Sequence, residues 1–456
     1  MKIDILQVYI LLSILGLALC YTETQYTYTA KLDNFKPSDR REFTARYYEI
    51  RDYFDPNTGP VFLYQCGEYE CSGFPDYRLF PIELAQEYNA LVLTLEHRFY
   101  GASQPFDTWD TDNLRYHTTD QALVDTANFI QQMKAQLADE TGRSDDIPFF
   151  MFGASYPGAF VAFFQTKFPH LVKGTVASSA VVNPIIDFWQ FDHHLTQVIP
   201  DYCIDAIHAS TYRLEDTYPD CKADYNADDL NMFDFFYMMA DTHVGLVQYG
   251  NQSSLCDRFS TILPEDYNSY SDYQDAVMVE WNDVFFNVVA PDPQDYNQEH
   301  LADTTIVQSD SSRCWWWQKA TQLPYYQTYL DETSLRSYSV DLEGHFDRVS
   351  YIYGLDRSLF SENGPFPDAA RTIREFGGVG LKGQKISFVN GHDDPWIEAG
   401  YTETDDFYLR PSQVVFSYQA GHACDLVTPT DDDSFLLQEA RHTEEDYIRR
   451  WINEIW

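Results

Sequence analysis

Five short apolar runs stand out along the chain, and each ends in a turn of small or polar residues. They cover residues 61–65, 90–95, 148–152, 385–389 and 414–418. Continuous apolar runs of this length are typical of strands that are buried on both faces, as in a parallel sheet covered by helices on each side. The pattern therefore predicts five strands of one buried sheet.

Helical patterns lie between these runs. Thr118 and Gln121 have the spacing of a capping box, in which each side chain binds the backbone N–H of the other. The positions that follow are apolar at helical spacing, at 123, 127, 130 and 133. Strands that alternate with helices predict a doubly wound, mostly parallel α/β domain.

The segment 184–376 interrupts this alternation. It is polar and aromatic, and it contains four cysteines. We interpret it as an inserted, mainly helical cap domain braced by disulfides. The predicted organisation is a signal peptide at 1–20, the first part of the core at 21–183, this insertion, and the second part of the core at 377–456.

The N-terminus and the charge indicate the compartment. Lys2 precedes an apolar run at 5–19, and Ala18 to Cys20 offer small residues for cleavage, as in a secretory signal peptide. An uncleaved anchor is the alternative. We expect a secreted, lysosomal or vacuolar protein without membrane insertion after cleavage. The net charge of −41 argues against nucleic acids and anionic membranes as partners.

Seven of the eight cysteines follow Cys20. In an oxidising compartment we expect most of them to pair, with one thiol left over. Cys66 and Cys71 are close enough in sequence to close a small loop, and the other connectivity stays open. Asn251 begins an Asn-Gln-Ser acceptor for N-glycosylation, which fits secretion.

A candidate nucleophile lies in residues 153–158, Gly-Ala-Ser-Tyr-Pro-Gly, between a predicted strand and an apolar helix. A sharp strand-to-helix turn would lift Ser155 above the sheet, as in a nucleophile elbow. The backbone N–H of Tyr156 would stabilise the oxyanion of the transition state. Pro157 departs from the G-x-S-x-G motif, although proline is tolerated in a first helical turn.

A base and an orienting acid follow in the order that α/β-hydrolases use, Ser, acid, His. Asp394 and His422 each lie on a loop directly after a predicted strand, as Ser155 does. The three side chains would therefore meet at the carboxyl edge of one sheet. On geometry alone Asp393 could replace Asp394, and we interpret His392 as a solvent-facing or structural residue.

Several blocks resemble the prolyl-carboxypeptidase family of serine peptidases, which includes lysosomal Pro-X carboxypeptidase and dipeptidyl peptidase II. The matching blocks are 32–35, 43–47, 59–68, 96–105, 120–125, 177–181, 390–396 and 421–426. Asn34 departs from the family pattern, which has His there, and Ala320 and Gln322 depart from its Cys and Glu. The Asn-Gly-x-x-Asp-Pro-Trp block of the family places the acid on Asp394.

The resemblance implies an α/β-hydrolase fold and cleavage beside proline in peptide substrates, without metal or cofactor. It implies that Ser155, Asp394 and His422 form the catalytic triad. It also implies Gly67 as a second oxyanion donor and Trp396 and Glu68 as substrate-binding residues. Which peptide end is recognised stays open, and so does a homodimeric state. Whether the enzyme works at acidic pH also stays open, because excess carboxylates raise the pKa of a histidine and so oppose its action as a base in acid.

Other interpretations remain open. An esterase or lipase could use the same fold, and so could a catalytically silent binding protein. Residues 96–98, Glu-His-Arg, favour a buried ion-pair network that holds loops over a part in the chemistry. The consecutive Trp315, Trp316 and Trp317 cannot all face one side of a helix, so at least one of them serves packing.

Overall fold

The computed structural model describes residues 21–143, 147–402, 413–417 and 420–453. The expected signal peptide at 1–20 lies outside the described residues. Across the described ranges, no helix has both the length and the apolar character needed to cross a membrane.

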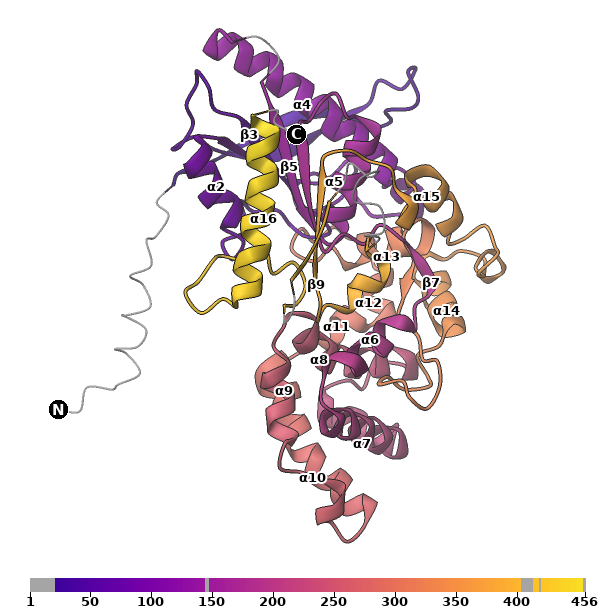
Figure 1. Cartoon of the computed structure of the whole chain (residues 1–456). Coiled ribbons are helices and arrows are strands. Elements are labelled where there is room, and N and C mark those ends of the chain that lie inside the picture. Colours follow the sequence, from indigo (N-terminus) through magenta and orange to yellow (C-terminus); the bar gives the residue numbers. More distant parts are fainter. Residues whose placement is uncertain (1–20, 144–146, 403–412, 418–419, 454–456) are drawn as a thin grey trace, which may run out of the picture.

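One eight-stranded sheet forms the centre of the molecule, in the order β1-β2-β4-β3-β5-β6-β9-β10 (Figure 1). In that order the strands are β1 (Glu23–Lys31), β2 (Glu42–Ile50), β4 (Leu91–Leu95), β3 (Val61–Gln65), β5 (Phe149–Ala154), β6 (Gly174–Ser178), β9 (Ile386–Gly391) and β10 (Gln413–Ser417). β2 pairs antiparallel with β1 and β4, whereas the pairs from β4 to β10 are all parallel. This is the α/β-hydrolase fold, and all five predicted strands are present.

Three strands of the eight-stranded sheet were not predicted from the apolar pattern. β1 and β2 form the antiparallel edge, and their buried positions are mixed with exposed ones, so neither is a continuous apolar run. β6 is fully buried, but its sequence is Gly-Thr-Val-Ala-Ser. Its small residues leave room for close packing against the neighbouring elbow, and they hide the strand from a search for bulky apolar runs.

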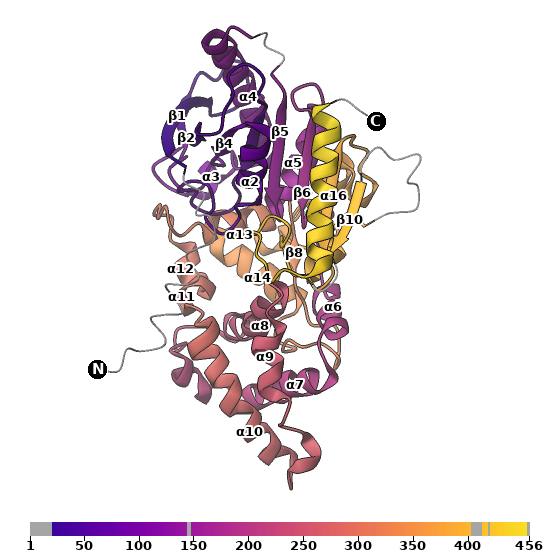
Figure 2. The ribbon, with the colours of Figure 1, turned by 60° about the vertical axis from the view of Figure 1, so that its left-hand side comes forward.

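Helices cover both faces of the sheet. α4 (Thr119–Thr141) and α5 (Tyr156–Lys167) pack on the face that presents Leu63 and Met151. α2 (Phe80–Tyr88) and α16 (Phe435–Ile452) pack on the opposite face, which presents Phe62 and Phe150 (Figure 2). The alternation of these side chains between two apolar clusters follows from the period of two along a strand.

The capping box is only half present. Thr118 Oγ1 accepts the backbone N–H of Gln121 at 3.2 Å, as predicted. The Gln121 side chain, however, does not return to Thr118. It accepts the backbone N–H of Asn34 at 2.8 Å and donates to Asp33 at 2.9 Å, because the segment after β1 lies across the start of α4.

The chain between β6 and β9 is mainly helical and contains one two-stranded sheet. It contributes most residues of a second apolar cluster, which also includes Phe99 and Tyr100 of the core. That sheet is β7 (Ile185–Asp187) and β8 (Tyr325–Tyr326). The α-helices are α6 (Gln190–Val198), α7 (Asp201–Thr217), α8 (Met232–Gln248), α9 (Gln252–Phe259), α10 (Tyr270–Asp283), α11 (Pro293–Tyr296), α12 (Gln298–Ala302), α13 (Ser312–Thr321), α14 (Leu342–Tyr353) and α15 (Ala369–Phe376). We call this helical segment the insertion; it extends from the carboxyl edge of the sheet in both views.

Short helical turns complete the described elements. α3 (Thr111–Leu114) precedes α4 in the core. A π-helical turn, η3 (Val284–Val289), continues α10. The 3-10 turns are η1 (Asp220–Tyr225), η2 (Pro264–Asp266), η4 (Arg357–Leu359), η5 (Gly378–Gly380) and η6 (Pro395–Ala399).

Two disulfides lie within the described residues. Cys66 and Cys71 close the small loop after β3, as predicted, and Cys203–Cys256 ties α7 to α9 within the insertion. Four of the seven cysteines after Cys20 are paired, so most of them pair, as expected. The expectation of a single leftover thiol was wrong, because Cys221, Cys314 and Cys424 are all free. A disulfide needs two Cβ atoms about 4 Å apart, and the fold distributes these three over η1, α13 and the loop after β10.

Candidate active site

Ser155 lies at the sharp turn between β5 and α5. Its backbone has φ 65° and ψ −126°, an unusual region for a residue with a side chain. Such a conformation costs roughly 1–3 kcal/mol and persists only where the surroundings impose it. The Ser155 backbone N–H donates to Ser178 O at 2.9 Å, so the end of β6 holds the turn. The side chain is half-buried, as the elbow prediction requires.

Two glycines make this turn possible. A Cβ on Gly153 would lie 2.3 Å from Pro157 O, and one on Gly158 would lie 2.5 Å from Ser178 O. Pro157 itself stands in the first turn of α5, where its missing N–H would have had no helical partner. The departure from G-x-S-x-G is therefore accommodated, because the crowded positions are still glycines.

The turn after β3 lies against the elbow. A Cβ on Gly67 would fall 2.4 Å from Pro157 Cγ and 2.7 Å from Pro157 Cδ. The backbone of Gly67 therefore touches the first turn of the helix that begins at Tyr156. Only a residue without a side chain permits this approach, since the proline ring is rigid.

We expect Gly67→Ala to lower kcat/KM on the order of 10²-fold, because the methyl group would push the turn away from the elbow. Steady-state kinetics on a peptide substrate would measure it. Gly245→Ala in α8 is the matched control, since a Cβ there meets nothing within 4 Å. An equal, small effect of both substitutions would contradict this role of the close approach.

His422 and Asp394 are directly paired. The His422 Nδ1–H donates to Asp394 Oδ2 at 2.7 Å, and the two residues are only 6% and 1% exposed. Asp394 Oδ1 accepts the Trp396 backbone N–H at 3.0 Å, which fixes the carboxylate. With Nδ1 donating, Nε2 of His422 is left to act as an acceptor.

Asp393 points elsewhere. Its Oδ2 accepts from Gln252 of the insertion at 3.1 Å, and its Oδ1 faces His392 at 3.4 Å. His392 is an exposed residue. The structure thus separates the two neighbouring aspartates that the residues alone left equivalent, and it pairs His422 with Asp394.

The loops that carry Ser155 and His422 meet at the end of β6. Ser178 O accepts the Ser155 N–H, and Ser179 Oγ accepts the Ala423 N–H at 2.9 Å. Among the described residues, Ser155 Oγ forms no hydrogen bond with His422. Such bonds are often long before substrate binds, and the shared anchorage on two consecutive serines keeps both loops at one strand end.

The insertion contacts the His422 loop directly. The His422 backbone N–H donates to Gln248 O at the end of α8, at 2.6 Å, and Trp396 Nε1 donates to Gln248 Oε1 at 2.9 Å. A Cβ on Gly421 would lie 2.4 to 2.6 Å from the backbone of residues 248–250. No local pattern in the sequence marks Gln248, because its partner His422 is 174 positions away.

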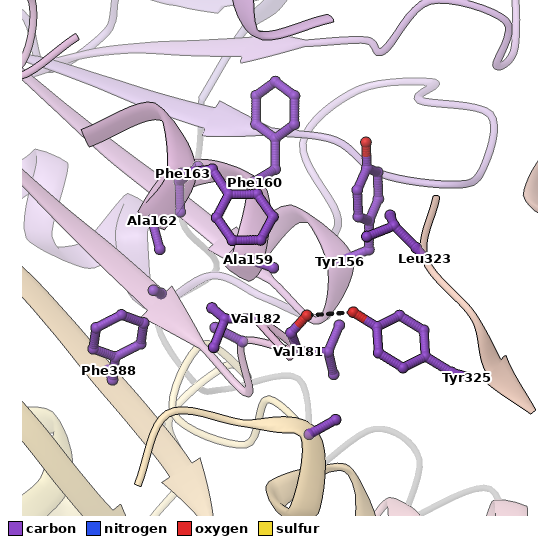
Figure 3. Packing of buried hydrophobic residues seen from close by; sticks show 14 of the residues in the cluster. Tyr156, Ala159, Phe160, Ala162, Phe163, Val181, Val182, Leu323, Tyr325 and Phe388 are labelled. Carbon is purple, nitrogen blue, oxygen red and sulfur yellow. Dashed lines mark hydrogen bonds between the residues drawn. The ribbon is translucent and has the colours of Figure 1, made fainter. Parts of the chain in front are cut away.

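A group of aromatic side chains, called here the aromatic wall, adjoins the pair of His422 and Asp394. Trp396 is half-buried and packs against Phe188, Phe191 and Tyr325, with ring centroids 5.0 to 5.8 Å apart. Tyr325 is held by a hydrogen bond from its hydroxyl to Val181 O, beside Tyr156 and the start of α5 (Figure 3). β8 thereby brings an aromatic residue of the insertion next to the elbow.

The three consecutive tryptophans divide as expected. Trp315 is half-buried and lies 5.8 Å from the Tyr156 ring, whereas Trp316 and Trp317 are buried in the apolar cluster of the insertion. The helix α13 presents only one of the three toward the elbow.

Glu68, one residue after Gly67, carries an unpartnered carboxyl oxygen. Its Oε2 is buried without a hydrogen-bond partner. Burial raises the pKa of Glu68, and the nearby charges of Arg78 and His422 oppose that rise. An acidic group with open hydrogen-bonding capacity therefore lies beside His422.

Residues 96–98 form the buried network that the sequence predicted. Glu96 pairs with Arg46 at 2.6 Å, and Arg98 holds Asp125 through two bonds of 2.6 and 2.8 Å. His97 Nδ1 donates to Arg98 O, so its Nε2 accepts from Tyr156 OH at 3.0 Å. Burial lowers the pKa of His97 to about 4, and the neutral ring anchors the residue after Ser155.

Nothing in the described part of the chain groups three or more His, Cys, Asp or Glu side chains as metal ligands. The chemistry that this arrangement can perform is that of a serine nucleophile, a histidine base and a carboxylate that orients the base.

Comparison with known proteins identifies the family of this chain. Residues 30–444 match the family model "Serine carboxypeptidase S28". A probable serine protease of Arabidopsis thaliana is 34% identical over 89% of this chain and 81% of its own length. The thymus-specific serine protease of Mus musculus is 26% identical over 93% and 86% of the two chains. The lysosomal Pro-X carboxypeptidase of Bos taurus is 25% identical over 93% and 87%. The chain therefore belongs to the serine carboxypeptidase S28 family and is a serine-type peptidase.

Proposed function

We propose that this peptidase cleaves peptide bonds beside proline as an exopeptidase, with Ser155 as nucleophile, His422 as base and Asp394 as the group that orients the base. The observation that carries the proposal is the buried hydrogen bond of 2.7 Å between His422 and Asp394, on loops that share the end of β6 with the strained elbow. No second serine in the described residues combines such an elbow with such a pair.

In the proposed reaction, Ser155 Oγ attacks the substrate carbonyl carbon while His422 Nε2 takes the hydroxyl proton. The backbone N–H groups of Tyr156 and Gly67 stabilise the oxyanion. The C–N bond then breaks, and the imidazolium gives its proton to the leaving amine. Water hydrolyses the acyl-enzyme by the same steps, and Asp394 stabilises the imidazolium each time.

Preference for proline is supported by the aromatic wall around Trp396. A pyrrolidine ring is rigid and apolar, so it binds well between flat aromatic faces. The name of the bovine relative points the same way. We assign to Glu68 the binding of a polar group of the substrate, which its unpartnered carboxyl oxygen supports. We also propose that the protein is secreted, lysosomal or vacuolar. Two relatives support this, since one is named as lysosomal and the other as extracellular.

The test is product analysis on one peptide with a single internal proline, offered with free ends, with an acetylated N-terminus and with an amidated C-terminus. We expect cleavage beside proline that one of the two blocking groups abolishes, which also tells which end is recognised. A matched peptide with alanine in place of proline should be cleaved at least about tenfold more slowly, the size of a small apolar contact in a pocket.

Equal cleavage of the proline and alanine peptides would reject the proline preference. Cleavage that neither blocking group affects would reject the exopeptidase. Hydrolysis of acyl esters without hydrolysis of either peptide would favour the esterase alternative. The Ser155→Ala protein, prepared in parallel, shows which activity belongs to this site.

A further inference from the structure

A buried pair of carboxyl groups ties the His422 loop to the rest of the core. Asp425 lies three residues after His422, and its Oδ1 accepts the Ser178 hydroxyl of β6 at 2.5 Å. The Asp425 side chain also interacts with the side chain of Glu444 of α16. Asp425 is 1% exposed and Glu444 is 0% exposed, so water does not solvate either group.

No donor from the described residues reaches the facing oxygens. Asp425 Oδ2 and both carboxyl oxygens of Glu444 are buried without a hydrogen-bond partner. Two ionised carboxylates offer only acceptors and repel each other in a buried site. The two side chains can satisfy one another only if one of them carries a proton.

The charged groups around the pair do not remove this requirement. Arg441 of α16 donates to the backbone oxygens of Cys424, Asp425 and Val427, and it pairs with Asp433. Arg78, in the loop before α2, acts on Asp425 only through space. The Cys424 thiol beside Asp425 is neutral, because burial raises its pKa far above the ordinary value.

The pair is connected to both reacting side chains by short paths. Ser178, which donates to Asp425, also accepts the Ser155 backbone N–H through its carbonyl oxygen. The next residue, Ser179, accepts the Ala423 N–H. Asp425 therefore joins α16, the His422 loop and the β6 end on which Ser155 rests.

We propose that Asp425 and Glu444 share one proton, and that this shared proton holds the His422 loop against the end of β6, so that both are positioning residues for the reaction. The inference rests on the proposed function, because it concerns the same Ser155 and His422.

The shared proton makes the stability of the fold depend on pH. Burial and the charge of Asp425 raise the pKa of Glu444 well above its ordinary value. A carboxyl group whose folded pKa is raised stabilises the fold while protonated, that is, fully below the unfolded pKa of about 4.3. That stability is lost as the pH rises toward the folded pKa. Ionisation of the second carboxyl would then push the His422 loop from its position.

The test is Glu444→Gln, with Glu439→Gln on the exposed side of α16 as the matched control. The glutamine amide can donate to Asp425 at every pH, so it replaces the shared proton. We expect kcat at acidic pH within about threefold of the unsubstituted enzyme, and an alkaline limb of the kcat profile that moves to higher pH. The melting temperature of Glu444→Gln should also fall less as the pH rises. Glu439→Gln should match the unsubstituted enzyme in all three.

Glu444→Leu removes the pair and should lower kcat at least tenfold with little change in KM. Superimposable pH profiles of Glu444→Gln, Glu439→Gln and the unsubstituted enzyme would overturn the proposal. If Glu444→Gln does not fold, Asp425→Asn supplies the same amide from the other side, and failure of both would equally overturn it.

Failure of the proposed function is seen separately. An enzyme that neither hydrolyses peptides nor reacts with a fluorophosphonate at Ser155 would reject the proposed catalysis. The pH dependence of the melting temperature would still report on the shared proton, because it needs no substrate.

Discussion

Ser155→Ala is expected to lower kcat for a proline-containing peptide by roughly 10⁶-fold, the scale seen when the nucleophile of a serine peptidase is removed. Without Oγ no acyl-enzyme forms, and only the oxyanion donors and substrate binding remain to accelerate attack by water. Steady-state kinetics would measure the loss. Labelling by a fluorophosphonate probe would measure the same nucleophile without any assumption about substrate.

Ser254→Ala, at an exposed position of α9, is the control and should keep both activity and labelling. Mass spectrometry of the labelled enzyme should find the probe on Ser155. Labelling that persists in Ser155→Ala would place the nucleophile elsewhere and reject the assignment.

Asp394→Asn is expected to lower kcat by about 10⁴-fold, with a much smaller change in KM. An amide in place of the carboxylate donates an N–H to His422 Nδ1, so the ring proton moves to Nε2. His422 then cannot accept the Ser155 proton, although the fold is kept. The kcat values of the purified proteins measure this, and circular dichroism checks that the variant is folded.

Asp393→Asn is the matched control, since it makes the same change one residue earlier. Asp393 accepts from Gln252, whereas His422 pairs with Asp394, so the Asp393 substitution should change kcat by less than about tenfold. A loss of 10⁴-fold in Asp393→Asn with an active Asp394→Asn would reverse the assignment of the acid.

Local pattern was sufficient for the strands that are continuous apolar runs and for the turn at Ser155. A run of large apolar residues followed by Gly-Ala-Ser predicts a strand and a turn from ten residues alone, because burial and the turn depend on neighbours in the chain. β6 could not be predicted in this way, because its close packing against the elbow requires small residues, which form no apolar run. Thr118 was placed correctly as a helix cap, yet the partner of Gln121 was not, since that partner comes from another segment.

The sequence by itself determined the fold class and the positions of Ser155, of the adjacent Asp393 and Asp394, and of His422 directly after strands. Each of those depends on local burial and turn chemistry. Only the tertiary structure decided that His422 binds Asp394 while Asp393 turns to Gln252, that Gly67 lies on Pro157, and that Glu444 meets Asp425. These contacts join residues that are far apart in sequence, or they distinguish two neighbouring residues. They are set by the packing of whole helices and strands, and no local periodicity of the sequence predicts that packing.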